Sequence, residues 1–291
     1  MRGLAEYAMS GRMQAAVMAI LFGLIPGFFL GLSVVSGAVV ALVTLRRGWQ
    51  DGLPMLLWAL LPAGLQWKLG DPSQAFVLVG VVIAALSLRR WQSWQVVILL
   101  MLAVGIGLQW SLPWQTSYLA KVKEAVEQLQ RNGVQVQVLD NGKVVNATPE
   151  QVIEALLRYY GASQMLMMFG CMVLSRYWQA LLYNPGGFRQ EFHQLRLDWR
   201  LMVLMAALIA AGIYGISPLA DWVFMLFMVP VVQGMAVVHY VVAHRNMGKA
   251  WLVLAYLLLL IAAPAFALLG LIDALANIRK RLDVTKENLK D

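Results

Sequence analysis

Four polar side chains that could bind a ligand lie inside long apolar runs of this sequence: Arg176, Gln233, His239 and Asp273. If these runs cross a membrane, a polar or charged group within them is costly, and such residues often belong to a substrate, ion or proton site. We therefore take these four residues as candidate ligand-binding residues.

Three of the candidates also have a purely structural interpretation. Arg176 is near the end of its run and can extend its guanidinium group to the boundary, where Tyr177 and Trp178 would lie beside it. A single histidine on a helix, such as His239, can serve packing or hydrogen bonding alone. Asp273 can pair with the nearby Arg279 or mark the end of its run. The sequence leaves these alternatives open.

The sequence lacks the motifs of the common catalytic and nucleotide-binding sites. It contains no P-loop and no HExxH, and the segment around Ser33 and Ser36 is not GxSxG. His239 and His244 lie off a common helical face and have no acidic neighbour at zinc-ligand spacing. The single cysteine, Cys171, lies in an apolar run and can form no internal disulfide. We expect no metal, no cofactor and no enzymatic activity.

The composition indicates the class of elements that hold these residues. Apolar residues make up 60% of the chain and charged residues only 13%, which leaves too little charge for a soluble surface. The net charge of +8 comes from basic residues beside apolar runs and forms no patch for nucleic acid. The sequence predicts an all-α, polytopic transmembrane helical bundle.

Nine apolar segments are predicted, several of them short. A crossing needs about 20 residues for roughly 30 Å of hydrocarbon. The run Ala15–Leu45 is long enough for two segments and contains Pro26, where we place the break. The other segments are Leu53–Trp67, Gln74–Leu88, Trp94–Leu112, Ser163–Tyr183, Leu201–Ile216, Trp222–Val242 and Trp251–Ala274.

The basic residues predict how the segments are oriented. With the amino terminus in the cytoplasm of a bacterium, nearly all short basic loops fall on the cytoplasmic side of the inner membrane through eight segments. A ninth crossing would place Arg279, Lys280 and Arg281 outside. Pro264 divides the last run, so we predict a kinked or re-entrant hairpin that returns the carboxyl terminus to the cytoplasm.

One charge-balanced polar stretch separates the two transmembrane halves and is predicted outside. Ser117–Gln130 has the apolar spacing of an amphipathic helix. Alternating valines around Asp140-Asn141-Gly142 predict a β-hairpin, and Thr148-Pro149-Glu150-Gln151 has the form of a capping box. The predicted organisation is a first half at 1–112, a small α/β insert at 113–160, a second half at 161–278 and a charged tail at 279–291.

Two cytoplasmic turns are candidate contacts for a partner or for lipid headgroups, although both can simply be orientation signals. A Pro-Gly-Gly sequence permits a tight turn, and the basic residues around both turns suit an interface. The candidate residues are Arg46, Arg47, Asn184, Gly186, Gly187 and Arg189.

Several short motifs, in this order, carry a resemblance to a known family. They are Arg12-Met13-Gln14-Ala15-Ala16, Arg46-Arg47-Gly48 with Asp51-Gly52, Asn184-Pro185-Gly186-Gly187-Phe188, Gln233-Gly234, and Gly270-Leu271-Ile272-Asp273 followed by Arg279-Lys280-Arg281. Over nearly its full length the chain resembles the YybS-type family of bacterial membrane proteins. That family is distantly similar to the substrate-binding subunits of energy-coupling-factor vitamin transporters, which dock on a coupling protein with two ATPases.

The sequence is therefore compatible with two functions. The first is an integral inner-membrane protein that binds or transports a small molecule, alone or as a subunit of a coupling ATPase complex. The second is a scaffold without transport activity that contacts a membrane partner through the outer insert. Both require the lipid bilayer, and neither involves nucleic acid.

Overall fold

The computed structural model describes residues 1–24, 30–140 and 143–288. The chain divides into two compact units. The first unit contains residues 1–92 and 100–179, and the second contains residues 93–99 and 180–291. This division differs from the predicted halves, because most of the helix that begins at Tyr160 packs with helices from the start of the chain.

The first unit is built almost entirely from helices. They are α1 (Arg2–Ser10), α2 (Arg12–Gly23), α3 (Leu30–Arg47), α4 (Trp49–Lys68), α5 (Ser73–Trp91), most of α6 (Trp94–Ser111), α7 (Thr116–Arg131), α8 (Pro149–Arg158) and most of α9 (Tyr160–Tyr183). Two separate helices, α2 and α3, occupy the run that was predicted to break, while Pro26 lies outside the described residues.

Close contacts at glycines explain why α9 belongs to the first unit. A Cβ atom on Gly37 of α3 would lie 2.5 Å from the sulfur of Cys171, and one on Gly80 of α5 would lie 2.4 Å from the sulfur of Met168. Cys171 and Met168 are both buried. Side chains of α9 thus fill the space that these two glycines leave, which produces close packing of the three helices.

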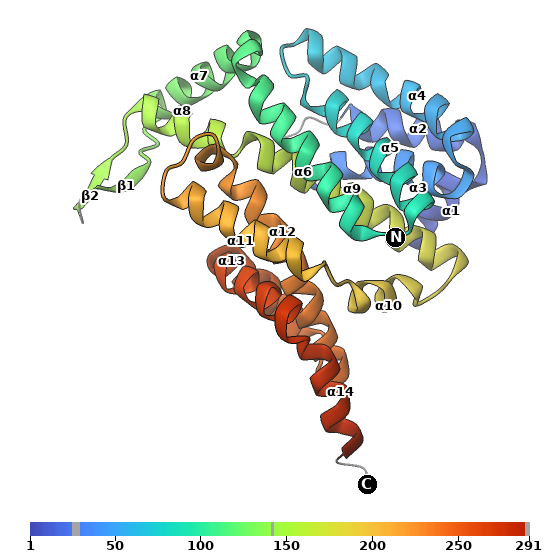
Figure 1. Cartoon of the computed structure of the whole chain (residues 1–291). Coiled ribbons are helices and arrows are strands. Elements are labelled where there is room, and N and C mark those ends of the chain that lie inside the picture. Colours follow the sequence, from blue (N-terminus) through green and yellow to red (C-terminus); the bar gives the residue numbers. More distant parts are fainter. Residues whose placement is uncertain (25–29, 141–142, 289–291) are drawn as a thin grey trace. The chain divides into compact units, whose positions relative to one another are not determined.

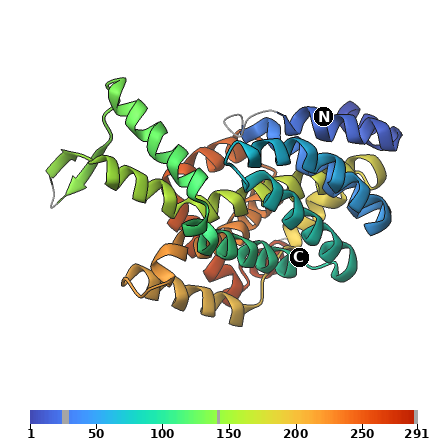
Figure 2. The ribbon, with the colours of Figure 1, turned by 90° about the horizontal axis from the view of Figure 1, so that it is seen from above.

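The insert follows the order helix, hairpin, helix. Strand β1 (Gln137–Asp140) pairs antiparallel with β2 (Lys143–Asn146), and the predicted turn residues Asn141 and Gly142 lie outside the described residues. The predicted capping box at Thr148 is confirmed, with both of its hydrogen bonds to and from Gln151. Figures 1 and 2 show the hairpin at the tip of α7 and α8, away from α2–α5.

The second unit contains the first turns of α6, the end of α9, α10 (Gly187–Gln194), α11 (Trp199–Ile213), α12 (Leu219–His244), α13 (Ala250–Ala276) and α14 (Ile278–Asn288). Helices α12 and α13 cross closely at two glycines. A Cβ atom on Gly270 would lie 2.1 Å from the carbonyl oxygen of Pro230, and one on Gly234 would lie 1.9 Å from that of Phe266. Only glycine permits this separation of the two backbones.

Five helical stretches of the described residues are long and apolar enough to cross a membrane. They are Ser73–Trp91, Trp94–Trp114, Pro149–Tyr183, Leu219–His244 and Ala250–Ala276. The count of nine crossings is not supported. Helices α2 and α11 are apolar but have 12 and 15 residues. At 1.5 Å per residue they extend about 18 and 22 Å, less than the hydrocarbon thickness.

The predicted irregularity at Pro264 is confirmed. Ala262, two residues before it, has φ −122° and ψ 34°, which is outside the helical region, so α13 is kinked there. Proline cannot donate the helical hydrogen bond and its ring crowds the preceding turn.

Candidate functional site

A cavity of about 200 Å³ lies in the first unit, at one end of its helices. Its lining comes from the amino-terminal halves of α3, α5 and α9, the carboxyl end of α4, the loop after α4, and α7 of the insert. Polar and apolar side chains are mixed in it. The lining residues are Ser33, Gly37, Gln66, Asp71, Ser73, Gln74, Val77, Leu78, Tyr118, Gln164, Met167 and Cys171.

Two glutamines of the cavity share one acceptor. Gln66 Nε2 donates to the carbonyl oxygen of Gly23 at 3.0 Å, and Gln74 Nε2 donates to the same oxygen at 3.2 Å. Gly23 is the last residue of α2, where carbonyl groups lack helical partners. Because a carbonyl can only accept, these contacts fix the orientation of both amides.

The orientation of Gln74 leaves a buried acceptor. Its Oε1 atom is inaccessible to solvent and has no hydrogen-bond partner within the described residues. A buried polar atom without a partner costs on the order of 1–3 kcal/mol. Gln74 thus lines the cavity and carries an acceptor that the described residues leave unsatisfied.

Tyr118 of α7 lines the cavity and packs against Tyr160. The rings of Tyr118 and Tyr160 lie with their centroids 4.9 Å apart. Tyr160 links two elements, because its hydroxyl accepts from Ser73 Oγ at 3.2 Å and donates to Gln115 Oε1 at 3.0 Å. Burial, followed by the neighbouring Tyr160 and Asp71, raises the pKa of Tyr118 to about 12. Tyr118 is therefore a neutral phenol at physiological pH.

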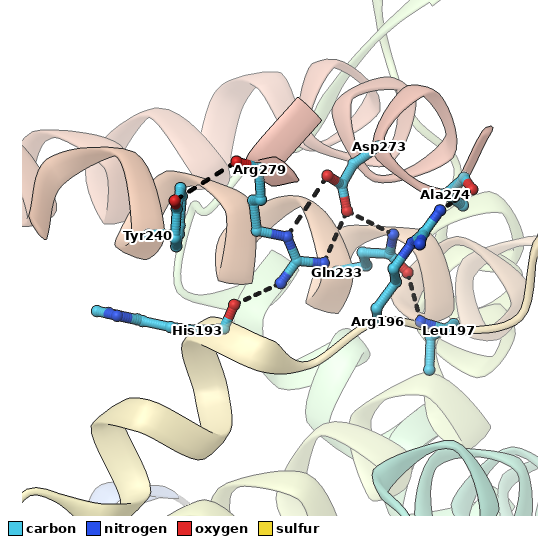
Figure 3. Close-up of polar contacts among 8 residues, drawn as sticks. All are labelled: His193, Arg196, Leu197, Gln233, Tyr240, Asp273, Ala274 and Arg279. Atoms are coloured by element: carbon cyan, nitrogen blue, oxygen red, sulfur yellow. Dashed lines mark hydrogen bonds and ion pairs between the residues drawn. The ribbon is translucent and has the colours of Figure 1, made fainter. Parts of the chain in front are cut away.

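A second polar group of residues lies in the second unit and centres on Asp273 (Figure 3). Its Oδ2 atom accepts from Arg279 Nη2 at 2.7 Å and from Gln233 Nε2 at 2.9 Å. All three side chains are buried, and Asp273 and Gln233 are 0% exposed. The alternative that Asp273 pairs with a buried Arg279 is confirmed.

The buried side chains of this cluster make their hydrogen bonds to other groups of the protein. Gln233 Oε1 accepts from the backbone N–H of Leu197 at 2.9 Å, and Arg279 Nη1 donates to the carbonyl of His193 at 2.6 Å. Arg196 Nη2 reaches the carbonyl of Ala274 at 2.9 Å (Figure 3). The cluster joins α12, α13 and α14 to the segment before α11. None of its residues lines the cavity described above. Its geometry is that of a structural clasp.

Two of the four predicted ligand-binding residues, Gln233 and Asp273, are in direct contact. His239 is in the same helix as Gln233 but pairs elsewhere, with its Nε2 atom 2.9 Å from the hydroxyl of Tyr256. Arg176 belongs to the first unit, where its Nη1 atom donates to Gln179 Oε1 at 2.5 Å. Its neighbour Tyr177 is exposed, whereas Trp178 is fully buried within the protein.

Most of the predicted turn residues are exposed at the surface. Gly187 N donates to the carbonyl of Asn184 at 2.9 Å, and Gly186 has φ 86°, so a glycine is required there. Arg189 is exposed at the start of α10. In the other turn, Arg47 lies 3.7 Å from Asp51, and the backbone carbonyl of Arg46 accepts from Arg89.

Sequence reasoning missed the cavity. The glutamines Gln66, Gln74 and Gln164 are the signals that the sequence offers, because each lies in or beside an apolar run. Only the packing of α2, α4 and α5 brings Gln66 and Gln74 to one carbonyl. Among the described residues, no group of three or more His, Cys, Asp or Glu side chains could hold a metal ion.

No family model, curated protein or solved structure matches this chain. The resemblance to the YybS-type family therefore stays a prediction from short motifs.

Proposed function

We propose that this chain is an integral inner-membrane protein that binds a small molecule in the cavity of its first unit. The observation that carries the proposal is a cavity of about 200 Å³ whose lining mixes apolar side chains with Asp71, Ser73 and glutamines. Ligand sites combine apolar walls with a few oriented polar groups, and this lining has both. Typical drug-sized sites occupy roughly 300–1,000 Å³, so the volume suits a small ligand.

The position of the cavity within the helices supports access from outside the cell. Ser33 and Ser73 lie near the amino ends of α3 and α5, whereas Arg46, Arg47, Arg89 and Arg90 lie at the carboxyl ends of the same helices. Basic residues mark the cytoplasmic side. The cavity, with α7 of the insert over it, would then lie at the outer end.

Binding can serve capture, sensing or transport. For transport, we propose that the chain acts as a substrate-binding subunit, like those of energy-coupling-factor transporters that it resembles. A separate coupling protein with ATPases would then supply the energy. The candidate partner contacts on the cytoplasmic side are then the turns with Arg46 and Arg47 and with Asn184 to Arg189.

The test is a screen of small molecules by thermal unfolding of the purified, full-length protein. Met167 is half-buried in the cavity wall, so Met167→Trp fills the space. Gln164→Phe is a second filling variant, used if the first alters the unfolding temperature without ligand. Compounds that raise the unfolding temperature of the wild type and not of a filled variant support the proposal. A screen in which every stabilising compound acts equally on the filled variants contradicts it.

The insert favours a second function, which is contact with a partner protein. Its side chains Leu129, Val134, Val136 and Leu156 are apolar and between 45% and 51% exposed. A contact surface is marked by a contiguous apolar patch, and we propose that these four side chains contribute to one. Deletion of residues 133–147 should then abolish recovery of a partner by crosslinking in membranes and leave ligand binding unchanged. Loss of ligand binding with unchanged crosslinking would contradict this second function.

A further inference from the structure

The lining of the cavity offers hydrogen-bond acceptors and a negative charge, but no positive charge. Asp71 is its charged residue, and no lysine or arginine of the described part of the chain lines it. Residues 25–29, between α2 and α3, include no basic residue in the sequence. A ligand with a negative charge would therefore meet Asp71 without compensation.

The glutamines add acceptors and not donors. Both Gln66 and Gln74 use their amide nitrogen on Gly23, and Gln74 leaves its Oε1 atom buried without a donor. Gly23 ends α2, where the helix dipole has its negative end. These groups favour a ligand that donates hydrogen bonds and carries positive charge.

Two features near the cavity oppose the binding of a cation. The amino end of α5 favours anions, but its Ser73 N–H already donates to Asp71 Oδ1 at 3.0 Å. Lys121 of α7 is close, with its Cε atom 3.4 Å from the position of a Cβ on Gly70. Lys121 is exposed, however, and it makes no ion pair with Asp71 within the described residues.

We infer that the cavity takes a small organic ammonium ion with a short apolar body. Asp71 is its counter-ion, and Val77, Leu78 and Met167 contact its apolar part. This inference rests on the proposed function, since it names the ligand class of the same cavity.

The test is isothermal titration of the full-length protein in nanodiscs with three probes of similar size at neutral pH: n-butylamine, butyrate and butyramide. We expect measurable binding of n-butylamine and none of butyrate. Asp71→Asn keeps the side-chain oxygen that caps Ser73, so the variant should fold, and it should weaken n-butylamine binding roughly tenfold or more because it removes one charge-assisted contact.

Two controls separate charge at the cavity from charge elsewhere. Asp221→Asn removes an exposed carboxylate at the start of α12 and should leave binding unchanged. Lys121→Met removes the nearby competing cation and should strengthen binding or leave it unchanged. Equal binding by wild type and Asp71→Asn, or no n-butylamine binding at all, overturns the ammonium assignment.

The outcomes also separate this inference from the proposed function. Binding of butyrate or butyramide that Met167→Trp abolishes would overturn the ammonium class and uphold a small-molecule cavity. If the compound screen also finds nothing that depends on the cavity, the proposed function fails together with the inference.

Discussion

At the scale of single residues, two ion pairs have nearly the same length but differ in how far their side chains are buried. Arg279 and Asp273 lie 2.7 Å apart with side chains 8% and 0% exposed, whereas Arg2 and Glu6 lie 2.8 Å apart with side chains 70% and 54% exposed. Removal of one partner from a buried pair leaves a desolvated charge, while an exposed pair is screened by water. The two pairs should therefore respond very differently to loss of the carboxylate.

Asp273→Asn should lower the free energy of unfolding by about 3–5 kcal/mol, because Arg279 stays buried without its counter-ion. Glu6→Gln, the matched exposed control, should change it by at most about 1 kcal/mol. The double variant Asp273→Asn with Arg279→Met should be less destabilised than Asp273→Asn alone, since no unpaired charge remains. Denaturant unfolding in mixed micelles measures all three, and equal effects of Asp273→Asn and Glu6→Gln would contradict the clasp.

His193, outside the membrane-spanning helices, predicts a pH dependence of stability. Burial, followed by the positive charge of Arg189, lowers the pKa of His193 from its usual 6.5. The unfolded chain thus takes up a proton near pH 6.5 while the folded chain does not, so the unfolded state binds more protons on acidification. Stability contributed by neutral His193 is present above about pH 6.5 and is lost as the pH falls below it.

His193→Gln should flatten the fall in unfolding temperature between neutral and mildly acidic pH, because it removes the group that titrates. His244→Gln in the last turn of α12 is a comparison on a neighbouring histidine. A wild-type and His193→Gln profile with the same slope would show that His193 does not contribute.

At the scale of elements, the crossing of α12 and α13 depends on glycine at two positions. Gly270→Ala places a methyl group 2.1 Å from the carbonyl oxygen of Pro230, and backbone atoms cannot move aside as a side chain does. The two helices must separate, and we expect a loss of about 1–3 kcal/mol. Gly64→Ala in α4 has no heavy atom within 4 Å and should be neutral or stabilising by up to about 1 kcal/mol. Thermal unfolding of both variants checks this, and a neutral Gly270→Ala would contradict the close crossing.

Local features of the elements could be predicted from the sequence. Apolar runs, the Thr148 capping box and the break at Pro264 depend on residues close in the chain, and the structure has each of them. The pairing of Asp273 with Arg279 was foreseeable for the same reason. The cavity was not, because Gln66, Gln74 and Tyr118 meet only after α2, α4, α5 and α7 pack, and no local pattern records that packing.

At the scale of the whole molecule, the distribution of charge predicts orientation in the membrane. We expect the insert outside and the turn after α12 inside. In a Cys171→Ser background, Asn132→Cys follows α7 and Lys249→Cys precedes α13, and both positions are exposed. A membrane-impermeant maleimide should label Asn132→Cys in intact cells and label Lys249→Cys only after lysis. The reverse pattern would invert the predicted topology.

The same assay applies to the carboxyl terminus, where the predicted return to the cytoplasm depends on the kink at Ala262 and Pro264. Lys280→Cys in α14 is exposed and should be labelled only after lysis. Labelling in intact cells would mean that α13 makes a full crossing in spite of its kink.

Binding in the cavity of the first unit is the central claim, and native mass spectrometry of the full-length protein released from membranes tests it most directly. We predict a bound species of low mass on the wild type that is absent from Met167→Trp. The comparison requires that the two proteins have the same unfolding temperature without ligand. A wild-type spectrum without any such species, or the same species retained by Met167→Trp and by Gln164→Phe, would contradict it.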